Sequence, residues 1–178
     1  MLRKLRMIIV TLLIRVAHPF GLSVHGFQDL RFDTELVIKN NGRINLGKST
    51  TTYKRVTLAA NGGSLRLGDY VFFNRNSIIA SLCEITIGNN CIFGPGVIIY
   101  DHDHKFNYQG IVHGEYHTGP IMIEDNCWIG ANVTILRGTH IGERCIIGAG
   151  TVVKGIIPPH SIVTSNRGMI IKPIEEKK

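Results

Sequence analysis

The residues that could do chemistry gather in one short segment. Residues 100–108 read Tyr-Asp-His-Asp-His-Lys-Phe-Asn-Tyr, and half of the chain's 8 histidines lie between residues 100 and 120. An imidazole has an ordinary pKa of about 6.5, so it can take a proton from a hydroxyl near neutral pH. His102 and His104 are two residues apart and would share one face of an extended segment. Either is a candidate general base for group transfer to a hydroxyl.

Other side chains near these histidines have less specific roles. Asp101 and Asp103 could each orient an imidazole, although a solvated aspartate is the more common case, and Lys105 is expected to be surface charge. His113 and His117 are four residues apart and could supply two zinc ligands. The 4 cysteines form no Cys-x-x-Cys pair, so neither a zinc ribbon nor a redox motif is supported. We expect no resident metal.

A repeat of six residues on both sides of this segment indicates the scaffold. One run of apolar residues at this spacing is Ile123, Ile129, Ile135, Ile141, Ile147 and Val153. A helix period of about 3.6 or a strand period of about 2 does not explain this spacing. A prism-shaped solenoid does, if each unit forms one short strand and a corner and three units complete a coil. Ile99 and Ile123 are 24 residues apart, a multiple of six, so the histidine segment interrupts the pattern without shifting its register.

The same register accounts for the cysteines. Each lies four residues after the apolar residue of its unit, at a position that should point into a narrow interior: Cys83, Cys91, Cys127 and Cys145. Free cysteine commonly behaves as a small buried apolar residue. We therefore expect no disulfide, which fits a reducing compartment.

A basic and apolar segment precedes the repeat. Arg3, Lys4, Arg6 and Arg15 flank the apolar run 7–14, in a chain with 20 Lys+Arg, 13 Asp+Glu and a formal charge of +7. The run is shorter than the roughly 20 apolar residues that a bilayer span needs, and no clear cleavage site follows it. It predicts an amphipathic helix that either packs on the body or lies at a membrane interface. No nucleic-acid-binding motif accompanies the basic charge, so we expect no nucleic-acid partner.

These motifs resemble the hexapeptide-repeat acyltransferases, most closely the maltose/galactoside O-acetyltransferase-like group. The resemblance rests on Ile123-Glu-Asp-Asn-Cys-Trp-Ile-Gly-Ala-Asn-Val, on Ile147-Gly-Ala-Gly-Thr-Val-Val and on Pro158-Pro159. It implies an all-β fold, a left-handed parallel β-helix with a protruding loop and a short N-terminal helix. It also implies a homotrimer that binds acetyl-CoA between neighbouring subunits and transfers the acetyl group to a sugar hydroxyl.

The resemblance assigns roles to particular residues. Counted without gaps from Ile87, His104 matches the catalytic histidine of the family, with His102 as the second candidate. The candidate cofactor contacts are Trp128, Ala131, Ala149, Lys154 and Arg167. The two alanines match positions whose backbone groups face the pantetheine arm of CoA, and Trp128 matches a tryptophan of the family's active site. Arg167 has no match in the family pattern but could meet a phosphate. The candidate substrate contacts are Asn74, Asp101 and Asp103. A lone tryptophan is as often a core or interface residue, a corner asparagine is often structural, and an arginine is by default on the surface.

The chain also departs from the family pattern. Lys154 is displaced by one residue from the usual Thr-Lys-Asp, and residues 165–169 replace the usual Gly-x-Pro-Ala. Ala80-Ser81-Leu82 stands where an acidic residue often accompanies the acceptor sugar. This departure counts against maltose or a galactoside as the acceptor. The basic N-terminal helix resembles those of acetyltransferases in surface-glycan pathways (capsule or lipopolysaccharide), and this resemblance implies a sugar nucleotide, a lipid-linked sugar or a glycan unit as the acceptor.

Three other functions stay open on the sequence: a sugar N-acetyltransferase, a non-catalytic solenoid interaction module, and a zinc lyase of the γ-carbonic-anhydrase type. The expected organisation is a helix over residues 1–20, a β-helix over 21–160 with a loop at 100–120, and a C-terminal tail over 161–178. We expect a cytoplasmic protein, peripheral at the inner face of the membrane where its N-terminal helix meets lipid.

Overall fold

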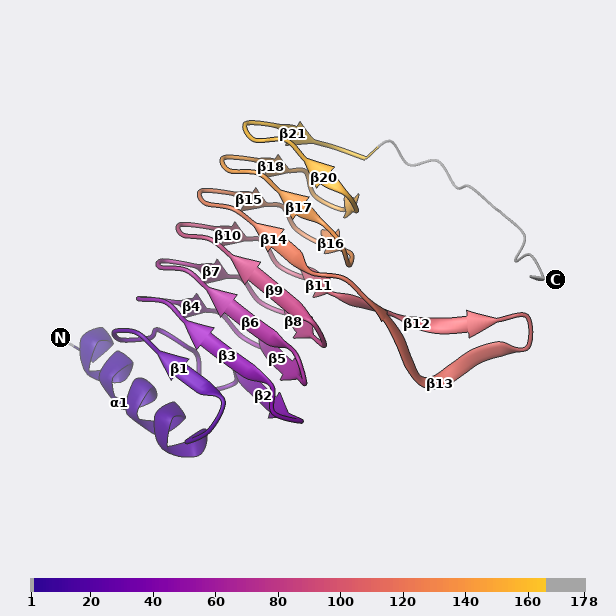
Figure 1. The fold of residues 1–178 in the computed structure, drawn as a ribbon. Coiled ribbons are helices and arrows are strands. Elements are labelled where there is room, and N and C mark those ends of the chain that lie inside the picture. Colours follow the sequence, from indigo (N-terminus) through magenta and orange to yellow (C-terminus); the bar gives the residue numbers. More distant parts are fainter. Residues whose placement is uncertain (1, 166–178) are drawn as a thin grey trace.

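The computed structural model describes residues 2–165, which wind into a parallel β-helix of triangular cross-section (Figure 1). Three parallel sheets form its faces. Sheet A contains β1 (Leu22–Val24), β3 (Arg43–Leu46), β6 (Ser64–Leu67), β9 (Glu84–Ile87), β14 (Ile121–Ile123), β17 (His140–Ile141) and β20 (Ile156–Ile157). Sheet B contains β4 (Thr51–Thr52), β7 (Phe72–Phe73), β10 (Ile92–Phe93), β15 (Trp128–Ile129), β18 (Ile146–Ile147) and β21 (Ile162–Val163). Sheet C contains β2 (Glu35–Lys39), β5 (Thr57–Asn61), β8 (Ile78–Ser81), β11 (Ile98–Tyr100), β16 (Thr134–Ile135) and β19 (Val152–Val153).

The repeated apolar position faces the interior, as the period of six predicts. Ile79, Ile99, Ile135 and Val153 stack in successive coils of sheet C, and all four are buried. Each buried residue follows a partly or fully exposed one, because successive side chains of a strand point to opposite faces. The predicted left-handed parallel β-helix is confirmed.

Turns at the corners require a backbone that few residues adopt. Asn76, Asn90, Asn126 and Asn132 all have φ between 53° and 62°, in the left-handed region that asparagine tolerates better than most residues. Gly88 serves a different need, because a Cβ there would lie 2.3 Å from a carboxylate oxygen of Asp125 in the next coil. The left-handed turns at the corners therefore explain several of the chain's asparagines, and the close approach of neighbouring coils explains the glycine at position 88.

Three of the four cysteines fill the interior as expected. Cys91, Cys127 and Cys145 are buried, and each thiol donates to a carbonyl oxygen of the following coil at 3.1–3.2 Å. The hydrogen bond with Cys127, together with burial, raises the pKa of the Cys91 thiol. Cys83 differs from the prediction because it is only partly buried, at the corner where the regular repeat is interrupted.

The N-terminal helix α1 (Leu2–Ala17) lies beside β1 at the N-terminal end of the solenoid (Figure 1). Val10 and Thr11 are buried against the body, and the Thr11 hydroxyl accepts a hydrogen bond from the backbone N–H of Gln28 at 2.8 Å. Arg6 forms an ion pair with Asp29. α1 thus packs on the body. No helix in the part of the chain that the structure describes is both long enough and apolar enough to cross a bilayer.

The C-terminal boundary of the solenoid lies further along the chain than residue 160. β21 pairs with β18 in parallel register, with Ile162 opposite Ile146 and Val163 opposite Ile147. The last coil therefore includes residues 161–163, which the sequence analysis assigned to the tail.

Candidate active site

The histidine-rich segment is an ordered β-hairpin rather than an irregular loop. β12 (His102–Asn107) and β13 (Gly110–Thr118) pair antiparallel and project from the corner between sheets C and A, which we call the C–A edge (Figure 1). The polar sequence had suggested a loop, because it lacks the period of six. A β-hairpin needs only cross-strand pairing, and its residues are mostly exposed on both faces.

Asp101 anchors the base of this hairpin. It is fully buried, so the common solvated state does not apply and its carboxylate is not open to a substrate. Its Oδ2 accepts from the Ser81 hydroxyl at 2.7 Å and from the Cys83 N–H at 2.8 Å, while its Oδ1 accepts from the Leu82 N–H at 2.8 Å. These bonds tie the hairpin to the preceding coil. The predicted substrate contact by Asp101 is therefore replaced by a structural one.

The same carboxylate orients the first histidine. His102 Nδ1 lies 3.1 Å from Asp101 Oδ1, and because an ionised carboxylate only accepts, Nδ1 must carry the hydrogen. The expectation that an aspartate orients an imidazole is met by Asp101.

Both candidate bases contact one tyrosine across the hairpin. His104 lies opposite Tyr116 in the β12–β13 register, and their ring centroids are 4.8 Å apart. The His102 and Tyr116 rings meet edge-on with centroids 5.6 Å apart, and the Tyr100 ring also meets His102 edge-on at 5.4 Å. His102 is largely covered by these contacts, whereas His104 is exposed. The two imidazoles share one face, as their spacing predicts.

Charged contacts fix the direction of the hairpin. Arg137, from the corner after β16, donates from Nε to Asp103 Oδ2 at 2.5 Å. Lys105 and Glu115 form an exposed cross-strand pair at 3.0 Å. Asp103 therefore binds a guanidinium of the neighbouring coil rather than either imidazole in this chain, and Lys105 is surface charge as expected.

A second group of predicted residues lies at the corner between sheets B and C, which we call the B–C edge. Asn74 follows β7, Ala131 follows β15 and Ala149 follows β18, so the three occupy this edge in different coils. Asn74 Oδ1 accepts from the Arg75 N–H at 2.8 Å, and its backbone is not left-handed, unlike that of Asn76. The left-handed corner role thus belongs to Asn76 and not to Asn74.

Trp128 points outward from sheet B and is 55% exposed, so it is not a core residue. In the sheet register its neighbours are Ile92 on one side and Ile146 on the other. Lys154 is exposed at the C–A edge, just before Gly155. Arg167 lies outside the described residues.

One chain therefore does not bring the predicted site residues together. The histidines and Lys154 lie on the C–A edge, whereas Asn74, Ala131 and Ala149 lie on the B–C edge. Sheet C separates the two edges, and five residues of extended chain span roughly 17 Å. A site that combines both groups would need two copies of the chain.

Sequence reasoning missed three residues that shape this site. Tyr116 and Arg137 were not singled out, and Ser81 was noted only because the family often has an acidic residue there, although the three contact His104, Asp103 and Asp101 respectively. Tyr116 could have been found only by expecting a hairpin, in which residues on either side of a turn face each other. The other two needed the coil register, which places corners of adjacent coils together.

The two histidines that the zinc alternative invokes lie on the hairpin. His113 and His117 are exposed on β13. Within residues 2–165 no group of three or more histidine, cysteine or carboxylate side chains is placed to hold a metal ion.

Comparisons with known proteins agree with this architecture. A family model described as the hexapeptide repeat of succinyl-transferase matches residues 120–154. The chain is 32% identical over 145 residues to a putative lipopolysaccharide biosynthesis O-acetyl transferase, WbbJ, of Escherichia coli (strain K12), covering 76% of this chain and 74% of that protein.

Solved structures show the same likeness. A maltose O-acetyltransferase from Clostridium difficile 630 aligns with a TM-score of 0.57 at 30% identity, covering 88% of this chain and 71% of that one. The hexapeptide-repeat containing acetyltransferase VCA0836 from Vibrio cholerae O1 biovar eltor, complexed with acetyl coenzyme A, aligns with a TM-score of 0.59 at 26% identity, covering 88% and 73%. The chain spans between 48% and 59% of the length of three further acetyltransferase relatives. With its coils, its hairpin and these matches, the chain belongs to the hexapeptide-repeat acetyltransferase family.

Proposed function

We propose that this chain is an acetyl-CoA-dependent O-acetyltransferase that acts on a sugar hydroxyl, as a homotrimer with one active site between each pair of neighbouring copies. The observation that carries the proposal is the division of the candidate residues between two edges of one prism. Closed rotation of three copies about an axis along the solenoid would bring the C–A edge of one copy to the B–C edge of the next.

The chemistry follows from the exposed imidazole on the hairpin. His104 takes the proton of the acceptor hydroxyl, and the oxygen attacks the carbonyl carbon of the acetyl thioester. The tetrahedral oxyanion collapses, the carbon–sulfur bond breaks, and the CoA thiolate receives the proton from the imidazolium. A backbone N–H or the amide of Asn74 from the partner edge would stabilise the oxyanion. Tyr116 limits the rotation of His104, and the Asp101–His102 pair holds the hairpin base in place.

The B–C edge and the relatives support the identity of the cofactor and of the acceptor. Ala131 and Ala149 present short side chains at this edge, which leave backbone groups open to an extended ligand such as the pantetheine arm. The acetyl-CoA complex of VCA0836 and the lipopolysaccharide role in the name of WbbJ support acetyl-CoA as donor and a surface-glycan unit as acceptor. Basic charge, with a net of +7, favours the anionic CoA.

The first test follows CoA release with acetyl-CoA and a panel of sugars, sugar nucleotides and lipid-linked sugars. We expect His104→Ala to lower kcat/KM by about a hundredfold or more, as loss of a general base does. His113→Ala is the matched control, because it removes an exposed histidine from the same hairpin. Turnover that survives His104→Ala but not His102→Ala would show that His102 is the base. Absence of acetyl-CoA binding in the wild type would end the transferase proposal.

The second test addresses the shared site. His104→Ala and Ala149→Glu are made in separate chains, which are then co-expressed and purified as mixed assemblies. Each variant alone should be nearly inactive, because each damages one half of every site. A random mixture should regain about a quarter of the wild-type activity, because one pairing in four unites two intact halves. Mixed assemblies that stay inactive would place the whole site within one chain.

A further inference from the structure

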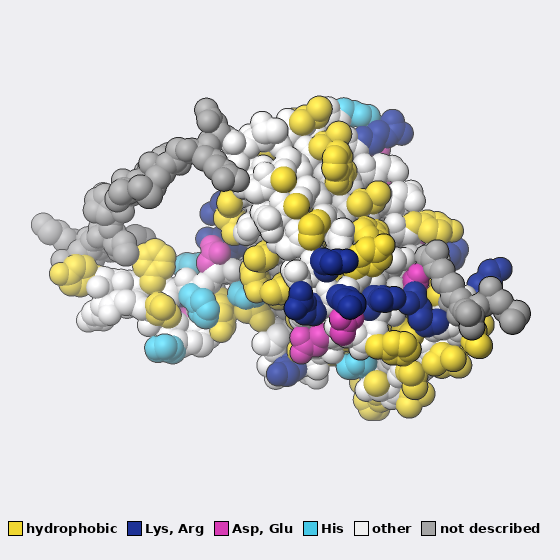
Figure 2. All heavy atoms as spheres, turned by 180° about the vertical axis from the view of Figure 1, so that it is seen from behind, with side chains coloured by type: hydrophobic (Ala, Val, Ile, Leu, Met, Phe, Trp, Pro, Cys, Tyr) yellow, Lys and Arg dark blue, Asp and Glu magenta, His cyan; other side chains and the backbone are white. Residues whose placement is uncertain are grey.

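The outward face of α1 is apolar along its whole described length. Val10, Thr11 and Ile14 face the body, while the opposite side carries exposed large apolar side chains: Leu5, Ile8, Ile9, Leu12, Leu13 and Val16. These six recur at spacings of three and four residues, so they form one continuous stripe on the helix. Monomeric proteins rarely expose such a contiguous patch unless it binds something. Figure 2 shows hydrophobic side chains gathered at this end of the molecule, at its lower right.

The charge around the stripe is of one sign. Residues 1–28 contain Arg3, Lys4, Arg6 and Arg15 and no aspartate or glutamate. Arg6 is engaged by Asp29, whereas Lys4 and Arg15 are exposed, with Arg15 donating to the Val24 carbonyl oxygen at 2.9 Å. On the helical wheel these two fall at the same margin of the apolar stripe, since they are eleven residues apart. Dark blue side chains lie close to the apolar cluster in Figure 2.

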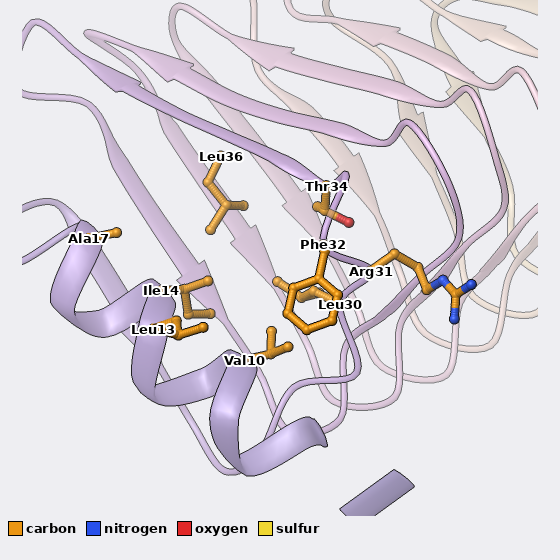
Figure 3. Close-up of a pocket in the computed structure, with 9 residues that line it drawn as sticks. All are labelled: Val10, Leu13, Ile14, Ala17, Leu30, Arg31, Phe32, Thr34 and Leu36. Atoms are coloured by element: carbon orange, nitrogen blue, oxygen red, sulfur yellow. The ribbon is translucent and has the colours of Figure 1, made fainter. Parts of the chain in front are cut away.

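A hydrophobic groove continues inward from the stripe. It has a volume of about 190 Å³ and lies between α1 and residues 30–36 (Figure 3). Val10 and Ile14 form its helical wall, and Leu30, Phe32 and Leu36 form the other. Leu13 belongs to both the groove and the exposed stripe. The groove therefore opens onto the same surface as the stripe.

We propose that this face of α1 lies flat on an anionic lipid bilayer, with the stripe in the acyl-chain boundary and Lys4 and Arg15 at the headgroups. At 16 residues, with one side already buried against the solenoid, α1 is held parallel to the surface and does not cross it. The proposal goes beyond the acetyl transfer described above and does not depend on it.

Charge decides between a membrane and a second copy of the chain. Two α1 stripes packed together would bring basic margins close to each other, with no acidic residue on either helix to compensate. An anionic surface pairs favourably with the same residues. Phe20, exposed just after the helix, adds an aromatic side chain of the kind found at bilayer interfaces.

Vesicle flotation with the full chain tests the proposal without using its activity. The wild type should float with phosphatidylcholine vesicles that contain phosphatidylglycerol and should float weakly with phosphatidylcholine alone. Lys4→Gln should weaken the anionic binding about fivefold, and added salt should weaken it further. The double variant Leu12→Glu/Val16→Glu should weaken it by about a hundredfold, because two apolar side chains no longer enter the lipid.

Ile156→Glu is the matched control, since Ile156 and Val16 are both 80% exposed but Ile156 lies in the last coil. This control should float like the wild type. Circular dichroism should show all variants folded, because the replaced side chains are exposed. The proposal is overturned if the wild type does not float, if Leu12→Glu/Val16→Glu floats like the wild type, or if that double variant changes the mass of the assembly in solution, which would make the face a contact between copies.

Discussion

Replacing Asp101 by asparagine should destabilise the chain far more than its single changed atom suggests. Both carboxylate oxygens accept a backbone N–H at 2.8 Å, from Leu82 and from Cys83. The asparagine amide has one oxygen and one NH₂ group, so in either orientation a backbone N–H faces a donor. Ser81 can adapt by donating to the Ser64 carbonyl oxygen 3.1 Å away, but the backbone N–H groups cannot.

The size of the effect follows from this count. A hydrogen bond to a charged acceptor contributes about 1.5–3 kcal/mol, and a buried donor left unpaired costs about as much again. We expect Asp101→Asn to lower the free energy of unfolding by about 3 kcal/mol, measured by urea denaturation at fixed protein concentration. The matched control is Asp103→Asn, because the Asp103 side chain is 43% exposed and has Arg137 as its partner. That control should cost less than about 1 kcal/mol.

Two results would refute this reasoning. One is an Asp101→Asn protein that unfolds within about 0.5 kcal/mol of the wild type, which would mean that the buried carboxylate is not the anchor of the hairpin. The other is an equal loss for Asp103→Asn, which would show that the hairpin depends on charge in general and not on the buried network.

Three further predictions concern the scaffold and the site. Gly88→Ala should lower the free energy of unfolding by about 3 kcal/mol, because its Cβ would clash with the next coil. Gly138→Ala should cost about 1 kcal/mol, because Gly138 has φ of 74° but open space around the new Cβ. Urea denaturation compares the two variants, and equal losses would contradict the packing argument. Iodoacetamide should label Cys83 in the folded protein well before Cys91, because burial blocks access to Cys91 and the pKa of the Cys91 thiol is raised. Mass spectrometry of peptides follows the labelling, and labelling in the reverse order would contradict the burial of Cys91. Tyr116→Ala should lower kcat by about tenfold while KM for acetyl-CoA changes little, because the imidazole loses its packing partner; a change confined to KM would indicate a role in binding instead.

The regular coils could be predicted from the sequence because a solenoid repeats one local rule. Most units place an apolar residue such as Ile79 or Ile135 at the same point of their strand, with Thr52 in β4 as an exception, so the period of six identifies the interior without long-range information. The positions of the corners followed directly. Cys83 departed from its prediction: it is only partly buried, and its backbone N–H donates to Asp101 at the corner where the period is broken.

The hairpin and its contacts could not be predicted in the same way. No periodic signal marks β12 and β13, and the pairing of His104 with Tyr116 depends on the position of a turn at residues 107–110. Burial of Asp101 depends on donors from the preceding coil, 18 to 20 residues earlier in the chain. The histidines were found because their chemistry is visible in their residue type, whereas their supports are visible only in three dimensions.

The hairpin leaves the ladders of the solenoid uninterrupted. β9 pairs with β14, and β11 with β16, so the coils before and after the hairpin stack as though it were absent. The chain thus separates a fixed frame from an exchangeable insert. A hairpin of another length or composition in place of residues 103–118 would remove the contact between Arg137 and Asp103 but would leave these two ladders intact, provided that Asp101 stays to anchor it. Changes of substrate within such a scaffold need not be accompanied by changes in its core, and the two parts are free to vary at different rates.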